Sequence, residues 1–203
     1  MNDKHQTVFS GELAELLRPV LGDECERCAE LLLKRYLRVE TVFSTDYEEL
    51  CTIVGPRGAI CIKLLARITS RRLTESFEFG KAHTECELTD YLKALFLGLS
   101  EEHLYVISLG DEAEVLGVDL VSVGTVNSAA IVPRNLVEIA LKRKAKSIML
   151  AHNHPGGRPE PSSDDNDMAT SLVGTMDKAG VCLKAHIVIA GSRHFVTTMN
   201  TGG

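Results

Sequence analysis

The chain has 203 residues, of which 44% are hydrophobic and 25% charged, and it carries a formal net charge of −6. This length suits one large domain or two small ones with a buried core. The charge excludes a chain that is drawn as a whole onto nucleic acid or an anionic membrane, although it leaves room for a local basic patch. We find no secretory signal and no apolar stretch long enough to cross a bilayer, so we expect a cytoplasmic protein.

The first third of the sequence predicts only helices. Apolar residues recur at helical spacing over residues 10–21 and 23–37, and again over 44–54 and 55–73. Ser44 or Thr45 is the expected cap of the third helix. Residues 75–87 show no period and are expected to form a linker. We therefore predict a small all-helical domain over residues 1–80 and a second domain over residues 81–203.

Four basic residues surround a Gly/Pro turn, "VGPRGA", between the third and fourth helices. Arg57 lies in the turn, and Lys63, Arg67 and Arg71 follow at steps of four on one helical face. A tight turn between helices can present backbone N–H groups to a phosphate, so these residues form a candidate contact to a nucleic-acid backbone. The alternative is a solvated face of a small packing domain.

The six cysteines are expected to be free thiols in a reducing compartment. The Cys25-x-x-Cys28 pair falls within a predicted helix and lacks the preceding strand of a redox motif. A structural zinc site made with His83 and Cys86 is an alternative, but the two halves lie far apart in the sequence. Buried or half-buried helix cysteines are favoured.

The second part of the sequence alternates helices and strands. A short helix over residues 89–99, with Thr89 as its expected cap, precedes a strand–turn–strand over 103–124. Further elements are a helix over 132–145, an almost wholly apolar strand over 146–155, a helix over 162–180, and closing strands over 181–191 and 194–200. The apolar strand is expected to be central and covered on both faces.

Two histidines end this apolar strand. His152 and His154 are two residues apart, so both side chains point to one face and converge near one point. Converging imidazoles suit a divalent metal, zinc best. The loop "PGGRPEP" is stiff and leads to Asp165, a third ligand one turn into the next helix. Two histidines and one carboxylate leave a fourth tetrahedral position for water, which is typical of a catalytic zinc.

Each fragment has a simpler explanation. Histidines at a strand end are often polar caps, and Ser162-x-x-Asp165 resembles a helix capping box, which needs no metal. Capping alone does not account for both fragments together across a short Gly/Pro loop. The conjunction favours the metal site.

The spacing resembles the JAMM motif of the JAB/MPN metalloprotease superfamily: His-x-His, seven residues, Ser, two residues, Asp. "LAHNHPGGRPEPS" more narrowly resembles the RadC family, bacterial proteins historically labelled DNA repair proteins. "CTIVGPRGAICIKLLARI" resembles the helix-hairpin-helix ahead of the RadC catalytic domain. The resemblance implies an α+β fold: a helix-hairpin-helix-like domain, then a mixed sheet flanked by helices in cytidine-deaminase-like α-β-α layers.

The resemblance also implies a metallopeptidase or isopeptidase that holds one Zn²⁺ per chain at His152, His154 and Asp165. A catalytic glutamate is expected just before the first strand, and aligning "VISLG" to that strand selects Glu102 over Glu101. In the implied mechanism Glu102 moves protons, while zinc and the Ser162 hydroxyl stabilise the tetrahedral oxyanion.

Several functions remain open from the sequence. The expected substrate is a peptide or isopeptide of unknown identity, and a protein partner or a homodimer is an open alternative. A DNA-repair accessory protein that contacts DNA through its helical hairpin is the second hypothesis, and a metal-dependent nuclease on the same scaffold is the third. Ala185 precedes His186 where the family has Asp-His, which predicts a weaker orientation of one ligand.

Overall fold

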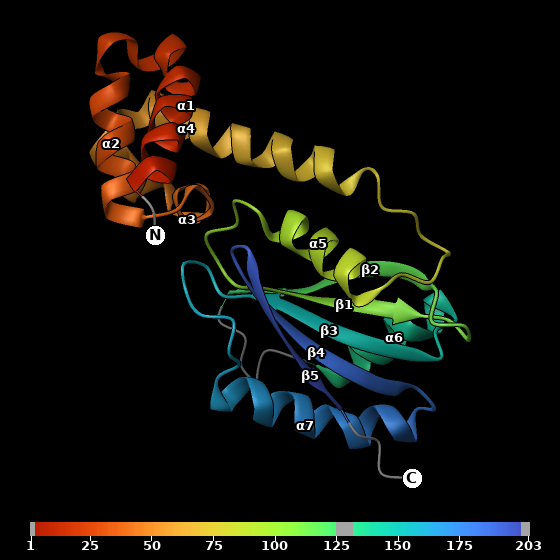
Figure 1. The fold of residues 1–203 in the computed structure, drawn as a ribbon. Coiled ribbons are helices and arrows are strands. Elements are labelled where there is room, and N and C mark those ends of the chain that lie inside the picture. The colour runs from red at the N-terminus through yellow and green to blue at the C-terminus, as the bar shows by residue number, and fades with distance from the viewer. Residues whose placement is uncertain (1–2, 125–131, 200–203) are drawn as a thin grey trace. The chain divides into compact units, whose positions relative to one another are not determined.

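The computed structural model describes residues 3–124 and 132–199, and it divides the chain into two compact units (Figure 1). The first unit comprises residues 1–72 and 97–100, and the second comprises residues 73–96 and 101–203. The division therefore falls eight residues before the expected boundary. It also assigns a short segment after residue 96 to the helical unit. None of the helices described has the length and apolarity to cross a membrane.

The first unit is helical, as predicted. Its elements are α1 (Asp3–Leu21), a 3-10 turn (Gly22–Glu24), α2 (Cys25–Tyr36), α3 (Val39–Ser44) and most of α4 (Tyr47–Thr74). One apolar core joins these helices and includes Leu17, Leu32, Leu50 and Ile62, all wholly buried. Cys25 and Cys28 belong to the same core, so they pack as apolar residues.

A kink at Gly55 divides α4 where the sequence predicts a Gly/Pro turn. Gly55 has φ 66° and ψ 172°, a conformation open in practice to glycine alone. Asp46 caps the start of α4, since its Oδ1 accepts the Glu48 N–H at 2.8 Å. The expected cap at Ser44 or Thr45 is wrong: Ser44 ends α3, and the Thr45 hydroxyl donates to the Thr41 carbonyl.

The expected linker over 75–87 is ordered and belongs to the second unit. Gly80 N–H donates to the Val115 carbonyl, and Val115 N–H donates to the Lys81 carbonyl, both at 2.8 Å. Helix α5 (Glu85–Phe96) begins within this segment. A reciprocal capping box of Thr84 and Glu87 starts α5, so the expected cap at Thr89 is wrong; Thr89 is buried inside the helix.

Five strands form one mixed sheet in the order β2-β1-β3-β4-β5. They are β1 (His103–Leu109), β2 (Val115–Val123), β3 (Ser147–Asn153), β4 (Cys182–Ala190) and β5 (Arg193–Thr198). Only β3 and β4 run parallel, and the other neighbours are antiparallel. The predicted central strand is therefore confirmed, because β3 is the third of five.

Helices cover both faces of the sheet, which gives the expected α-β-α layers (Figure 1). On one face lie α6 (Pro133–Arg143) and α7 (Ser163–Lys178), where Leu104 packs in one core with Leu136 and Met168. On the other face lies α5, whose Phe96 meets Tyr105 edge-on with ring centroids 5.5 Å apart. Alternate residues of β1 thus face opposite layers.

Candidate metal centre

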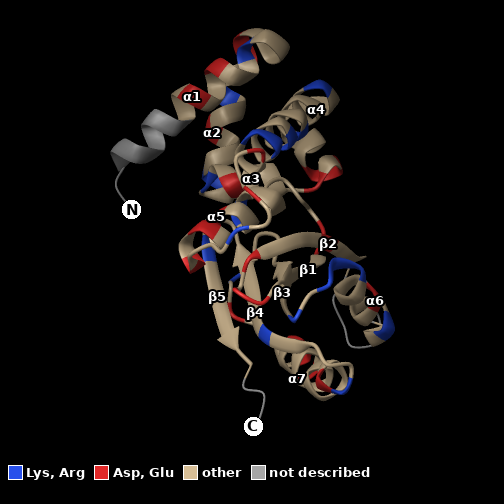
Figure 2. Cartoon of the chain, turned by 90° about the vertical axis from the view of Figure 1, so that its right-hand side faces the viewer, with Lys and Arg blue, Asp and Glu red and all other residues tan. Residues whose placement is uncertain are grey.

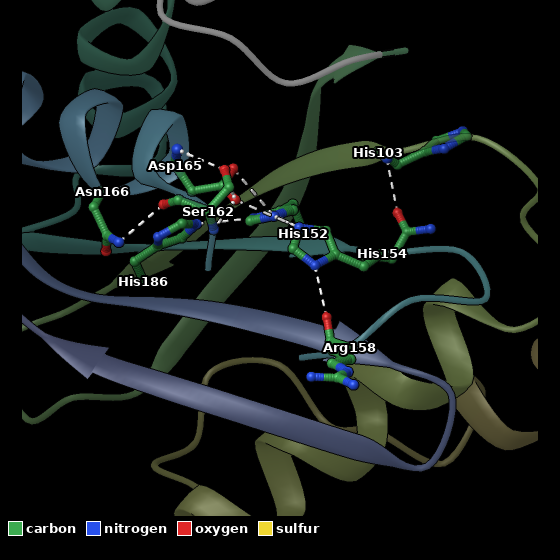
Figure 3. Close-up of polar contacts among 9 residues, drawn as sticks. His103, His152, His154, Arg158, Ser162, Asp165, Asn166 and His186 are labelled. Carbon is green, nitrogen blue, oxygen red and sulfur yellow. Dashed lines mark hydrogen bonds and ion pairs between the residues drawn. The ribbon is translucent and has the colours of Figure 1, made fainter. Parts of the chain in front are cut away.

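His152 is one of the last two residues of β3 and His154 directly follows the strand, and their rings lie side by side, as their spacing predicts (Figure 3). Their Nε2 atoms lie 2.8 Å apart. His152 is wholly buried and His154 half-buried. The two imidazoles therefore meet on one face of the sheet, at the carboxyl end of the central strand.

Asp165 reaches this pair from the first turn of α7. Its Oδ1 lies 3.4 Å from His152 Nε2, and its Oδ2 lies 3.4 Å from His154 Nε2. Ser162 donates from its backbone N–H and its hydroxyl to Asp165 Oδ2, at 2.8 and 2.6 Å. Asp165 N–H donates back to the Ser162 hydroxyl at 3.1 Å, so the two residues form a capping box. The capping arrangement and the metal-site arrangement occur together in the same residues.

This group could hold a metal ion. One ligand atom from each of His152, His154 and Asp165 lies within 4.8 Å of the others. A tetrahedral metal with bonds of about 2.0–2.1 Å separates neighbouring ligand atoms by about 3.3–3.4 Å. The shortest carboxylate–imidazole distances are 3.4 Å, one to each oxygen of Asp165, and the imidazole pair needs to open by only about half an ångström. Within the part of the chain that the structure describes, no fourth histidine, cysteine or acidic residue joins the group.

Each histidine directs Nε2 toward the centre because its Nδ1 is engaged elsewhere. His154 Nδ1–H donates to the Arg158 carbonyl at 2.7 Å, and His152 Nδ1 lies 2.8 Å from His186 Nε2 (Figure 3). A metal on His152 Nε2 requires the Nδ1–H to be the donor in that second bond. His186 can accept it, because burial lowers the pKa of His186 to about 3 and keeps the ring neutral.

Residue 185 has no direct part in this arrangement. Ala185 and His186 are successive residues of β4, so their side chains point to opposite faces of the sheet. His186 is the residue that meets the ligand His152, and it is present. The substitution of alanine for the family's aspartate therefore removes no contact on the face that carries the metal centre.

The Asp165 carboxyl is held in the charged form that a metal ligand needs. Burial raises its pKa, but hydrogen bonds from His152 and Ser162, with the charge of His152, outweigh burial and hold the pKa well below its usual range. The carboxylate is thus charged at neutral pH although its side chain is only 4% exposed.

Glu101 and Glu102 both lie just before β1, at the end of that strand which adjoins the histidines. The last backbone pair of β1 and β3 is Leu104 with His152, and Glu102 precedes Leu104 by two residues. Glu101 is exposed, and its backbone carbonyl accepts the Asn153 amide N–H at 3.0 Å. Glu102 is half-buried, and its backbone carbonyl accepts the Gly124 N–H at 2.8 Å.

Three of the four basic candidates are exposed on α4, and one is not. Arg57, Arg67 and Arg71 are exposed, whereas Lys63 is half-buried. Lys63 Nζ donates to the carbonyls of Phe43 and Gly98, at 3.0 and 3.3 Å, and burial lowers its pKa. Both signs of charge occur along the helical unit (Figure 2). Nucleic-acid binding stays a prediction, and it rests on the three arginines.

The cysteine-based zinc alternative finds no support among the described residues. Cys28 Sγ donates to the Ile53 carbonyl inside the helical core. His83 stacks on Phe77 with ring centroids 4.1 Å apart. Within residues 3–124 and 132–199, His152, His154 and Asp165 are the only group of three or more such side chains close enough to share a metal ion.

Sequence reasoning missed two residues that support the centre. His186 bonds a ligand histidine from the neighbouring strand, and Asn153, between the two histidines, is buried and bonded to β1. A histidine and an asparagine in otherwise apolar strands were the available signals. Their partners depend on strand order and register, which the sequence does not give.

A mixed five-stranded sheet between helices, with a His-x-His and aspartate group at the end of its central strand, defines a JAB-type domain. The family model described as RadC-like JAB domain matches residues 83–202, more than half of the chain. The chain therefore belongs to the RadC-like JAB domain family.

Curated relatives cover nearly the whole chain. A UPF0758 protein of Clostridium kluyveri is 29% identical over 93% of this chain and 86% of its own length. UPF0758 proteins of Clostridium acetobutylicum and Photorhabdus laumondii are each 31% identical, over 87% and 80% of this chain and 79% and 72% of their own lengths. The name UPF0758 describes no activity, so function has to be argued from the site.

Proposed function

We propose that this chain is a zinc-dependent hydrolase that cleaves an amide bond, either a peptide bond or an isopeptide bond to a lysine side chain. The observation that carries the proposal is the meeting of His152, His154 and Asp165 at the end of β3. Two neutral imidazoles and one carboxylate are a ligand set that zinc favours, and three protein ligands are typical of catalytic sites. When bound, zinc would lower the pKa of a coordinated water and polarise a substrate carbonyl.

Glu102 is the proposed general base and acid. Glu102 lies nearer than Glu101 to the Leu104–His152 pair and is half-buried where Glu101 is exposed, which supports this role over Glu101. The carboxylate takes a proton from the attacking water and delivers it to the leaving amine. A proton acceptor beside the ligand set is what hydrolysis needs and what a purely structural metal site would lack.

Ser162 has a structural duty and a proposed catalytic one. Its hydroxyl donates to Asp165 at 2.6 Å, so it first holds the ligand carboxylate. To stabilise an oxyanion, the hydroxyl must turn from this carboxylate to the substrate oxygen. Ser162 is not a nucleophile in this scheme, because Asp165, the carboxylate that its hydroxyl contacts, serves as a ligand of the metal and the zinc-bound water attacks instead.

Metal analysis and a cleavage assay test the proposal together. We expect one zinc per purified wild-type chain and cleavage of some member of a panel of peptides and lysine isopeptides. Glu102→Gln should retain zinc but lose about 10²–10⁴-fold in turnover, whereas Asp165→Ala should lose both. Glu101→Gln is the matched control and should keep both.

Three results would contradict the proposal or one of its parts. Equal zinc contents in wild type, His152→Ala and Asp165→Ala would show that these residues do not bind the zinc. Full turnover in Glu102→Gln with loss in Glu101→Gln would show that the neighbouring carboxylate is the base. Cleavage of a phosphodiester that depends on Asp165, with no amide cleavage, would favour the nuclease hypothesis.

A DNA-associated role is a second candidate, favoured by the exposed arginines Arg57, Arg67 and Arg71 on α4. Three guanidinium groups form a small footprint on a chain of net charge −6. Such a contact would supplement the metal centre rather than replace it.

A further inference from the structure

Asn153 stands between the two histidines in the sequence, and its buried amide side chain is bonded at both ends. The His103 backbone N–H donates to Asn153 Oδ1 at 2.7 Å, and Asn153 Nδ2 donates to the Glu101 carbonyl at 3.0 Å. The side chain is only 4% exposed. One partner is a donor and the other an acceptor, so the orientation of the amide is fixed by its surroundings.

These bonds continue the β1–β3 ladder beyond its last backbone pair. That pair is Leu104 with His152, and the Asn153 side chain then takes the place of the next rung. From the other neighbour of β1, Gly124 N–H donates to the Glu102 carbonyl. The backbone on both sides of Glu102 is therefore held by Asn153, and the carbonyl of Glu102 itself by the end of β2.

We infer that Asn153 is a positioning residue that ties the proposed base Glu102 to the strand that carries the metal ligands. This inference rests on the function proposed above. Since Asn153 is the last residue of β3 and stands between His152 and His154 in the sequence, one short segment sets both the histidine pair and the start of β1. Proton transfer is sensitive to displacements of about 1 Å, so a base on an unanchored segment would be poorly aligned.

Backbone hydrogen exchange tests the anchoring without any substrate. In the full-length, zinc-loaded protein, Asn153→Ala should speed exchange of the His103 amide at least tenfold while zinc content stays at the wild-type level. Asn153→Asp keeps an acceptor for this N–H and should preserve most of the protection. If the alanine variant fails to fold, the exchange rate at His103 in Asn153→Asp is measured in its place. Exchange that is unchanged in Asn153→Ala would overturn the inference.

Thr89→Val is the matched control. Thr89 is 1% exposed and, like Asn153, donates from its side chain to a backbone carbonyl of the same unit, that of Cys86 at 3.1 Å. Loss of the Thr89 hydrogen bond should leave the exchange rate of the His103 amide unchanged. Faster exchange at His103 in this control would show general loosening and would also overturn the inference.

A double-mutant cycle then tests positioning of Glu102, with the best substrate of the panel. Asn153→Ala should lower kcat about 10–100-fold and leave KM within about twofold. In the Glu102→Gln background the same change should cost nothing further, because no base remains to be aligned. Equal losses in both backgrounds would refute the positioning role. If the wild type cleaves no member of the panel, the proposed hydrolase fails, while exchange at His103 still decides the anchoring.

Discussion

His152 has another imidazole on each side. Its Nε2 faces His154 in the centre, and its Nδ1 meets His186, whose ring stacks at 4.9 Å between centroids. His186 Nδ1 is buried and has no hydrogen-bond partner among the described residues. This ring is therefore kept in place by packing and by its bond to His152. Protonation would add a proton to Nε2, which already accepts the N–H of His152 Nδ1.

The buried His186 should make folding pH-dependent. Its folded pKa of about 3 lies below the value of about 6.5 expected in the unfolded chain, so the unfolded state binds more protons between these values. Stability is thus complete above pH 6.5 and falls as the pH is lowered toward 3, by up to about 1.4 kcal/mol per pH unit. Urea unfolding of the metal-free protein at pH 7 and pH 5.5 measures this slope.

Two variants show whether His186 is the residue responsible for this dependence of stability on pH. His186→Gln should flatten it, because glutamine does not titrate. Thr89→Val, a change at a buried residue of the same unit that does not titrate, should leave the slope as in the wild type. A slope that survives in His186→Gln would place the titrating group elsewhere.

At the scale of elements, the two halves of α4 depend on Gly55. An alanine there would have to adopt φ 66° and ψ 172°, so we expect Gly55→Ala to lower the free energy of unfolding by about 1–3 kcal/mol. Gly174 offers the opposite case, since it is exposed within α7 and an added Cβ meets nothing within 4 Å. Gly174→Ala should stabilise the protein by about 0.5–1 kcal/mol.

Thermal and urea unfolding distinguish these outcomes. The Gly55 variant should melt earlier than wild type and the Gly174 variant later. If both glycines tolerated alanine equally, the kink would not require glycine.

Most elements are predictable because their signals are local. Alternation gives β1 and β2, and the apolar run gives β3. The same alternation brings His152 and His154 together. Missed features depend on context: α3 has only six residues, and the Thr84 capping box lies in a stretch without apolar period. Spacing by four aligns Lys63 with Arg67, but whether that position faces solvent or backbone carbonyls depends on the packing of the unit.

At the scale of the whole molecule, Lys63 and Arg67 should separate stability from DNA binding. Lys63→Ala leaves the carbonyls of Phe43 and Gly98 without this donor and should cost roughly 1–3 kcal/mol of unfolding free energy. Arg67 is exposed, so Arg67→Ala should change stability by less than about 0.5 kcal/mol.

In titrations of single-stranded and branched DNA, Arg67→Ala should have the larger effect of the two variants. Arg67→Ala should weaken binding and reduce the slope against log salt by about 0.7–0.9, the value for one phosphate contact. Lys63→Ala should leave the slope unchanged. An affinity that does not change with salt concentration, or that falls only in Lys63→Ala, would contradict a contact through the exposed arginines.

Because Asp165 also caps α7, an aspartate at this position in another member of the family is weak evidence that the metal site has been retained. A lineage that abandoned metal chemistry would still be under selection to keep Asp165 for the sake of its helix. Among the described residues the His154 side chain has no comparable second duty, since its contacts are with the other groups of the centre and with the Arg158 carbonyl of its own loop. In a homologue that has lost the metal site, we therefore expect the histidines to be substituted before the aspartate.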